Sequence, residues 1–158
     1  KLKVHEGEPG KILERGCAWI APGDYHMVVK RRGLAVRLET NQNPPENSCR
    51  PAVDALFRSV AKTYGSSALG VVLTGMGSDG VIGAQLIREA GGHVLAQDEA
   101  SSVVWGMPGQ VVEAGQVDGV YPLEAIGMEI TRRVQQSAGT RGNGWREEGR
   151  PAGAWSLE

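Results

Sequence analysis

The chain has 158 residues, of which 41% are hydrophobic and 22% charged, and its net charge is -1. This length suits about one domain, and the balanced charge excludes a strongly basic nucleic-acid binder. No apolar run approaches the roughly 18 residues that span a bilayer, and nothing at the start resembles a signal peptide. We therefore expect a cytoplasmic protein without direct membrane insertion. Cys17 and Cys49 match no disulfide or zinc pattern, and Lys1 in place of a methionine suggests a piece of a longer protein.

Strand-like patterns dominate the first forty residues. CAWIAP, residues 17–22, is a short apolar run that ends at the turn-forming residues Pro22-Gly23-Asp24. YHMVVKR, residues 25–31, resumes the strand-like pattern, so we predict a hairpin from these two runs. LAVRLE, residues 34–39, alternates apolar and polar residues as a half-buried strand does. The Asn- and Pro-rich loop at 40–50 has no periodicity and is long enough to be functional.

An amphipathic helix is predicted after this loop, with Pro51 in its first turn and Gly65 as its stop. Apolar residues recur at helical spacing on one face: Val53, Leu56, Phe57, Val60 and Ala61. ALGVVL, residues 68–73, is apolar throughout, which is typical of a strand covered on both faces in a parallel sheet.

Helices and strands alternate in the rest of the chain. We predict strands at 93–97 and 117–123, and helices at 80–90, from about Pro108, and at 123–136. This order predicts an α/β protein with a parallel sheet and right-handed crossovers. Residues 137–158 are rich in Gly, Arg and Glu without an apolar period, so we expect a disordered polar tail.

A glycine-rich turn, Gly75-Met76-Gly77-Ser78-Asp79-Gly80, joins the apolar strand to the next helix. Ligands and catalytic groups gather beyond the carboxyl ends of strands in open α/β sheets, which is where Asp79 should lie. Gly75 and Gly77 allow close backbone approach and leave the amides of Met76 and Gly77 free to face an anion. The turn is therefore the candidate functional site.

Two other interpretations of this turn remain open. Its glycines fit the G-x-G-x-x-G pattern of a dinucleotide-binding module, with Asp98 or Glu99 at the interval of a ribose contact. A carboxylate inside the turn argues against that module, because a pyrophosphate needs amides and positive charge. Asp79 is also placed to cap the helix that begins near Gly80, which is a common role for Asp.

The run VVLTGMGSDGVIGAQLIREAGGHVLAQDEASSVVWGMPGQVVEAG, with IAPGDYHM and RPAVDALFRSVA before it and VDGVYPL after it, covers most of the chain. Together these motifs closely resemble the catalytic domain of the bacterial chemotaxis protein-glutamate methylesterase family (CheB). The resemblance implies a three-layer, doubly wound, mostly parallel α/β domain (Rossmann-like), partial here over residues 1–136 and incomplete at its amino-terminal side. It also implies a serine esterase triad that hydrolyses glutamate methyl esters and deamidates glutamines, with neither cofactor nor metal.

The resemblance assigns roles within the turn. The acid of L-T-G-M-G-x-D-G is the family's triad Asp, which makes Asp79 the residue that orients the imidazole. The methionine of the same motif gives its backbone N–H to the oxyanion site, which implies that role for Met76, between Gly75 and Gly77. Both roles suit the chemistry, because a buried carboxylate fixes the tautomer of a general base and a turn amide stabilises a developing oxyanion.

The family's serine lies in a G-A-S-T-G-G-like turn and its histidine in a Q-H-M-like segment, and neither motif occurs in the sequence. We therefore expect the isolated chain to carry the triad Asp alone and to be inactive. None of the three local histidines is expected to substitute. His93 should begin a strand at the opposite edge of the sheet, His26 is a candidate to line the cleft, and His5 lies in a polar leader.

The partners that the resemblance implies are the cytoplasmic helices of methyl-accepting chemoreceptors and, in the full-length protein, a receiver domain. That domain covers the family's active site until it is phosphorylated. An alternative to the enzyme is a non-catalytic module that binds the same receptors. No nucleic-acid partner is expected.

Overall fold

The computed structural model describes residues 2–142, and the side chains of residues 2–136. The chain divides into two compact units, Lys1–Ile126 and Gly127–Glu158. The first unit holds the predicted site and begins with two short strands, β1 (Lys3–Glu6) and β2 (Cys17–Ile20), which pair in parallel. The strand β1 lies in the segment for which the sequence predicted only a polar leader.

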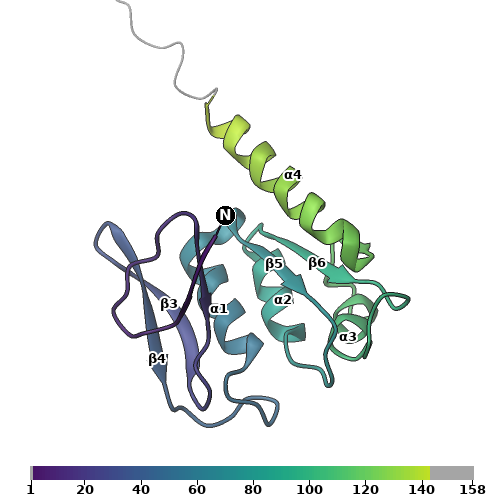
Figure 1. The fold of residues 1–158 in the computed structure, drawn as a ribbon, viewed down its shortest axis with the longest axis horizontal. Coiled ribbons are helices and arrows are strands. Elements are labelled where there is room, and N and C mark those ends of the chain that lie inside the picture. Colours follow the sequence, from purple (N-terminus) through teal and green to yellow (C-terminus); the bar gives the residue numbers. More distant parts are fainter. Residues whose placement is uncertain (1, 143–158) are drawn as a thin grey trace, which may run out of the picture. The chain divides into compact units, whose positions relative to one another are not determined.

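The second pair of strands is an antiparallel hairpin of β3 (His26–Arg32) and β4 (Ala35–Asn41) (Figure 1). The predicted hairpin between residues 17–22 and 25–31 is therefore wrong, because β2 pairs with β1 and β3 turns back onto β4. Both strand predictions hold, but their partners differ. The turn at Gly33, where φ is 61°, connects the hairpin that forms.

Helix α1 (Val53–Tyr64) follows the long loop and packs on the edge of β3 that β4 leaves open. The backbone N–H of Val29 donates to Ser59 Oγ at 3.0 Å, and Thr63 Oγ1 donates to the Val29 carbonyl at 3.4 Å. The two hydroxyls lie one helical turn apart and satisfy polar groups of a strand edge. Contrary to the prediction, Pro51 precedes the helix rather than occupying its first turn.

The remaining elements alternate as the sequence predicts. A short 3₁₀ turn (Gly65–Ser67) leads to β5 (Leu69–Val72), and α2 (Val81–Glu89) leads to β6 (His93–Gln97). Helix α3 (Met107–Glu113) then leads to β7 (Gly119–Tyr121). All neighbouring strands of this sheet are parallel, in the order β5-β6-β7, which confirms the α/β class and the parallel sheet.

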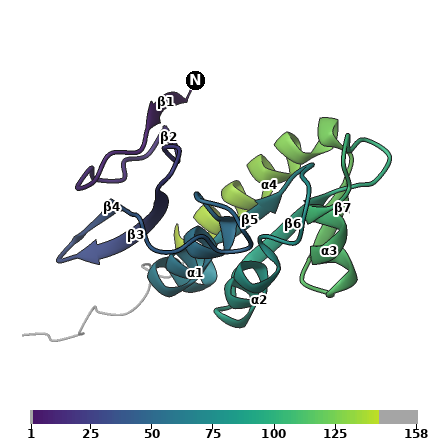
Figure 2. The same cartoon turned by 90° about the horizontal axis from the view of Figure 1, so that it is seen from below.

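The core lies between this sheet and its helices. Figure 2 shows α1, α2 and α3 on one side of β5, β6 and β7. Ala61 of α1, Ala84 and Ile87 of α2, and Val111 of α3 form one buried cluster with Val94 of β6. Within the described residues, β5 is an edge strand of this sheet, and its residues alternate between half-buried and buried.

Helix α4 (Leu123–Gly142) closes the described chain and runs past Gln136, where the sequence predicted the helix to end. Residues 143–158, most of the segment predicted to be disordered, lie outside the described residues. Among the helices in the described part, none combines the length and the apolar character needed to span a membrane.

Candidate active site

The glycine-rich turn leaves the carboxyl end of β5 and is held against the loop that follows β6. The Gly75 N–H donates to the Val104 carbonyl at 3.0 Å, and the Gly75 carbonyl accepts from the amides of Gly106 and Met107. The Thr74 N–H donates to Oε1 of Gln97, a fully buried side chain at the end of β6. The carboxyl ends of two parallel strands therefore fix the turn where the prediction placed a site.

Asp79 is buried, with only 6% of its surface exposed, and three donors surround its carboxylate. The backbone N–H of Val53 donates to Oδ2 at 2.6 Å, and that of Asp54 donates to Oδ1 at 3.0 Å. The side-chain amide of Asn47 donates to Oδ1 at 3.1 Å. Val53 and Asp54 are the first residues of α1, so Asp79 caps α1 and not the helix that follows it in sequence.

The Asp54 carboxylate, in turn, caps the amino terminus of α2. Its Oδ1 accepts from the backbone N–H groups of Gly80 at 3.1 Å and Gly83 at 2.7 Å, and its Oδ2 accepts from Asn47 at 2.9 Å. The two helices approach closely here, because a Cβ on Gly83 would lie 2.5 Å from the Cβ of Phe57. The prediction that Asp79 caps the helix near Gly80 is therefore wrong. In this exchange Asp79 caps α1, and Asp54, which belongs to α1, caps α2.

Asn47 and Asp54 were missed in the sequence as site residues. Asp54 had left a signal, because it lies three residues before Phe57 and seven before Ala61, on the apolar face of its helix. A charged residue on such a face indicates a buried polar partner. Asn47 had no comparable signal, since an Asn in a Pro-rich loop is ordinarily a turn residue.

This exchange argues against a dinucleotide site. A pyrophosphate would need the amides at the start of α2, and the Asp54 carboxylate already accepts from two of them. Asp98, one of the two candidates for the ribose contact, is bonded within its own loop. Its Oδ1 accepts from the Ser101 N–H at 3.0 Å and from the Ser101 hydroxyl at 2.6 Å. The amides of Gly80 and Gly83 are therefore not free to receive a pyrophosphate.

The backbone amides of Met76 and Gly77 donate to no acceptor among the residues that the structure describes. Gly77 has a φ of 97°, a left-handed conformation that turns the chain between Met76 and Asp79. The Met76 side chain is 86% exposed. Two free amides therefore lie two and three residues before the buried carboxylate, and the exposed Met76 side chain lies three residues before it.

None of the described histidines lies against Asp79. His26 is fully buried, its Nδ1 accepts from the Ala52 N–H at 3.2 Å, and its Nε2 lies 3.1 Å from the Pro44 carbonyl. His93 begins β6, at the amino end of the sheet, and is half exposed beside Asp118. His5 lies in β1, with its ring 5.1 Å from that of Trp19. None of these three rings forms a hydrogen bond with Asp79.

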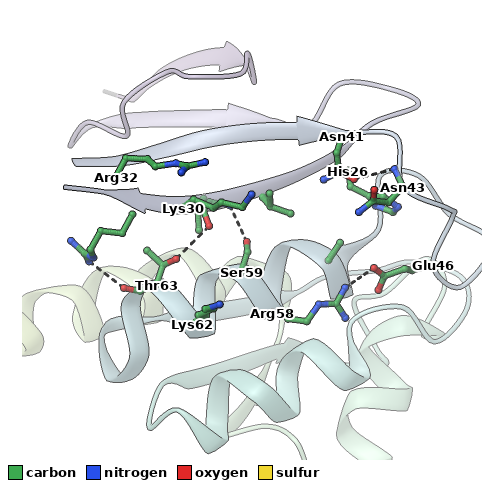
Figure 3. A pocket seen from close by; sticks show the side chains of 14 residues that line it. His26, Lys30, Arg32, Asn41, Asn43, Glu46, Arg58, Ser59, Lys62 and Thr63 are labelled. Carbon is green, nitrogen blue, oxygen red and sulfur yellow. Dashed lines mark hydrogen bonds and ion pairs between the residues drawn. The ribbon is translucent and has the colours of Figure 1, made fainter. Parts of the chain in front are cut away.

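A cavity of about 640 Å³ lies between the β3–β4 hairpin and α1 (Figure 3). His26 lines one end of this cavity, which does not include Asp79 or Met76 among its lining residues. Its cationic lining residues are Lys30, Arg31, Arg32, Arg58 and Lys62. Two carboxylates partly balance them: Glu46 pairs with Arg58, and Glu39 pairs with Lys30 and Arg32. The hydrogen bond from Lys30, followed by that from Arg32, lowers the pKa of the Glu39 carboxyl.

The loop that carries Asn47 is tethered by Arg50. Arg50 pairs with Asp24, and its guanidinium also donates to the carbonyls of Gln42 and Asn43, each at 3.2 Å. The hydrogen bond from Arg50 lowers the pKa of the Asp24 carboxyl below its ordinary value. In the described part of the chain, no group of three or more His, Cys, Asp or Glu side chains could hold a metal ion.

The fold and the site define an α/β protein with a buried, amide-held carboxylate and free turn amides at the carboxyl edge of a parallel sheet. The chain belongs to the CheB methylesterase family, whose model matches residues 1–130. It is 58% identical over 134 residues to the protein-glutamate methylesterase/protein-glutamine glutaminase of Trichodesmium erythraeum, and 56% identical over 131 residues to one from Rhodospirillum rubrum.

The solved structures include a similar fold. The crystal structure of the Thermotoga maritima CheB methylesterase catalytic domain matches with a TM-score of 0.80 and 39% identity, over 81% of this chain and 68% of that chain. The chain covers 38% of the Trichodesmium protein and 34% of the Rhodospirillum protein, while 85% and 83% of the chain are matched. About a third of the Thermotoga domain therefore has no counterpart in this chain.

Proposed function

We propose that this chain is the carboxyl-terminal part of the catalytic domain of a protein-glutamate methylesterase and glutamine deamidase, and that it supplies the triad aspartate. The supporting observation is the hydrogen bonding of Asp79. A carboxylate offers about four acceptor positions. Two on Oδ1 and one on Oδ2 are used, and the remaining position, on Oδ2, has no donor among the described residues. That position suits the N–H of an imidazole.

In the proposed reaction a serine hydroxyl attacks the ester carbonyl of a methylated glutamate. The histidine takes the serine proton and passes it to the leaving methoxide, which departs as methanol and leaves an acyl enzyme. Asp79 holds the imidazole in the productive tautomer and stabilises its charged form. The Met76 amide donates to the oxyanion, a contribution worth about 3 to 4 kcal/mol in comparable sites. Water then releases the glutamate carboxylate.

The serine and the histidine come from segments that this sequence does not contain, so we propose that the isolated chain is inactive. Substrates are the cytoplasmic helices of methyl-accepting chemoreceptors, and a receiver domain in the full-length protein controls access. These partners rest on the family resemblance.

The test is methanol release from methylated receptor by the full-length protein and its Asp79→Asn variant. Loss of the carboxylate should lower kcat by about 10⁴, because the imidazole loses its orienting acceptor. Asp118→Asn is the matched control, since Asp118 also accepts a backbone N–H, that of Val94, but at the amino end of the sheet. Equal activity of Asp79→Asn and the control variant would refute the assignment.

The cation-rich cavity favours a second candidate, a non-catalytic module that binds acidic receptor segments. This candidate predicts that the isolated chain binds a glutamate-rich peptide saturably, and that added salt weakens the binding. Lys62→Glu should reduce the affinity about tenfold, as expected when one charged contact is reversed. Lys11→Glu, whose side chain does not line the cavity, serves as control. Calorimetry that finds no binding would dismiss this candidate.

A further inference from the structure

We infer that Asn47 is a positioning residue for Asp79: its side-chain amide joins the Asp79 and Asp54 carboxylates and leaves Oδ2 of Asp79 for the histidine. This inference rests on the proposed function. It adds to the site a residue that lies 32 positions before Asp79 in the sequence, in the loop between β4 and α1.

The Asn47 amide has a specific geometry. Nδ2 lies 2.9 Å from Oδ2 of Asp54 and 3.1 Å from Oδ1 of Asp79, so its two hydrogens serve two carboxylates. Both carboxylates are buried, with 2% and 6% of their residue surfaces exposed, whereas Asn47 itself is exposed. Asn47, an exposed loop residue, thus donates hydrogen bonds to two buried carboxylates, those of Asp54 and Asp79.

A neutral amide is the suitable bridge for this pair. Two carboxylates repel each other, and each is already stabilised by backbone N–H groups at a helix terminus. A Lys or Arg at this place would compete with an imidazolium for Asp79, because it would form an ion pair with the same carboxylate. The Asn47 amide donates to both carboxylates without adding charge.

For catalysis, the Asn47 amide helps to hold the Asp79 carboxylate in one orientation. With Asn47 present, Oδ1 of Asp79 has two donors and Oδ2 has one, so rotation of the carboxylate would break three bonds. Without it, one backbone N–H remains on each oxygen, that of Asp54 on Oδ1 and that of Val53 on Oδ2. The carboxylate then gains freedom about its terminal torsion, which is broad and roughly two-fold. Oδ2 would then be presented to the histidine for a smaller part of the time.

The loop delivers Asn47 in a defined conformation. Asn47 and Ser48 have φ values of 51° and 62°, the left-handed region that Asn tolerates well. Glu46 and Cys49 close this turn with reciprocal backbone hydrogen bonds of 3.1 and 2.8 Å. The ion pair of Arg50 with Asp24 holds the following residue, so the amide is presented by an ordered turn.

The first test is Asn47→Gly in the full-length protein, with Ser48→Gly as the matched control. Glycine keeps the left-handed conformation and removes only the amide, and Ser48 shares that conformation one residue on. We expect Asn47→Gly to lower kcat about 10- to 100-fold, as misplaced catalytic groups do, with KM nearly unchanged. Ser48→Gly should match the parent protein. Equal kcat values for the two variants would overturn the inference.

The second test is Asn47→Asp, read from the pH dependence of kcat relative to the parent protein. The variant places a third carboxyl against Asp54 and Asp79, and its chain neighbour Glu46 is already paired with Arg58. When protonated, the new group donates one hydrogen bond to the pair; when ionised, it repels both members. The ratio of variant to parent kcat should therefore rise as the pH falls. A ratio independent of pH would contradict a positioning role.

The two proposals fail separately. Full activity of Asp79→Asn would refute the proposed function itself. Inactive Asp79→Asn together with fully active Asn47→Gly would refute only the role of Asn47. A thermal transition of Asn47→Gly that stays cooperative and well above the assay temperature would show that the variant is folded when kcat is measured, so a lower kcat would report positioning and not unfolding.

Discussion

Asp79 and Asp54 show how one arrangement of side chains serves both folding and chemistry. Each carboxylate accepts from the backbone N–H groups of the helix to which it does not belong, where the helix dipole favours negative charge. A buried carboxylate without such donors would be strongly destabilising. The exchange fixes the amino termini of α1 and α2 against each other and holds Asp79 rigidly at the carboxyl edge of the sheet.

Asp54→Ala tests this exchange through stability. The substitution leaves the amides of Gly80 and Gly83 without their acceptor and frees one hydrogen of Asn47. We expect a loss of about 1 to 3 kcal/mol in the free energy of unfolding, measured in urea. Glu113→Ala, which removes an exposed carboxylate of α3, should stay within about 0.5 kcal/mol of the parent. Equal losses for the two variants would contradict the exchange.

At the element scale, the segment that matters most is the loop between β4 and α1. It lines the cavity through Asn43 and Glu46, and through Asn47 it reaches Asp79. Its tether to the turn before β3 is the ion pair of Arg50 with Asp24. A substitution that breaks the Arg50–Asp24 ion pair should therefore change the position of Asn47 at Asp79.

The Asp24 tether gives a pH prediction. Its carboxyl pKa is lowered, first by the hydrogen bond from Arg50, so the folded value lies below the ordinary 3.8. A lowered folded pKa means that the tether contributes fully above the unfolded value and is lost as the pH falls through the folded value. Carbon-13 NMR should give an Asp24 midpoint below 3.8 in the parent chain and a higher one in Arg50→Met. The same midpoint in both chains would show that Arg50 does not hold Asp24.

At the scale of the whole molecule, the open edge of the parallel sheet is the main feature. β5 has a strand partner on one side only within the described residues, and apolar residues near the amino terminus are exposed, including Leu2, Val4 and Ile20. The chain covers 68% of the Thermotoga domain, so about a third of that domain has no counterpart here. Open strand edges and exposed apolar side chains promote association.

The isolated chain should therefore be marginally stable and prone to self-association. We expect its unfolding midpoint to rise with protein concentration in thermal scans, and a sedimenting species larger than the monomer at high concentration. A sharp, concentration-independent transition of monomeric protein would contradict this expectation.

The sequence predicts the elements of the parallel sheet well and their partners less well. The strand at 93–97 is found at those residues, and the helix predicted at 80–90 runs from Val81 to Glu89, because glycines and apolar periodicity are local signals. The pairing of β3 with β4 rather than β2 depends on contacts beyond the local pattern. The glycine-rich turn predicts Asp79 as a site residue from local sequence, whereas the contact of Asn47 with Asp79 appears only in the folded chain.

A crystal structure of the full-length protein tests the role of Asp79 most directly. We predict that a histidine nitrogen lies about 2.6 to 3.2 Å from Oδ2 of Asp79, in the acceptor position that Val53, Asp54 and Asn47 leave open. A serine hydroxyl should lie on the other side of that ring, within reach of the Met76 amide's oxyanion position. If no histidine contacts Asp79, or if the contact is to Oδ1, the account of this site is wrong.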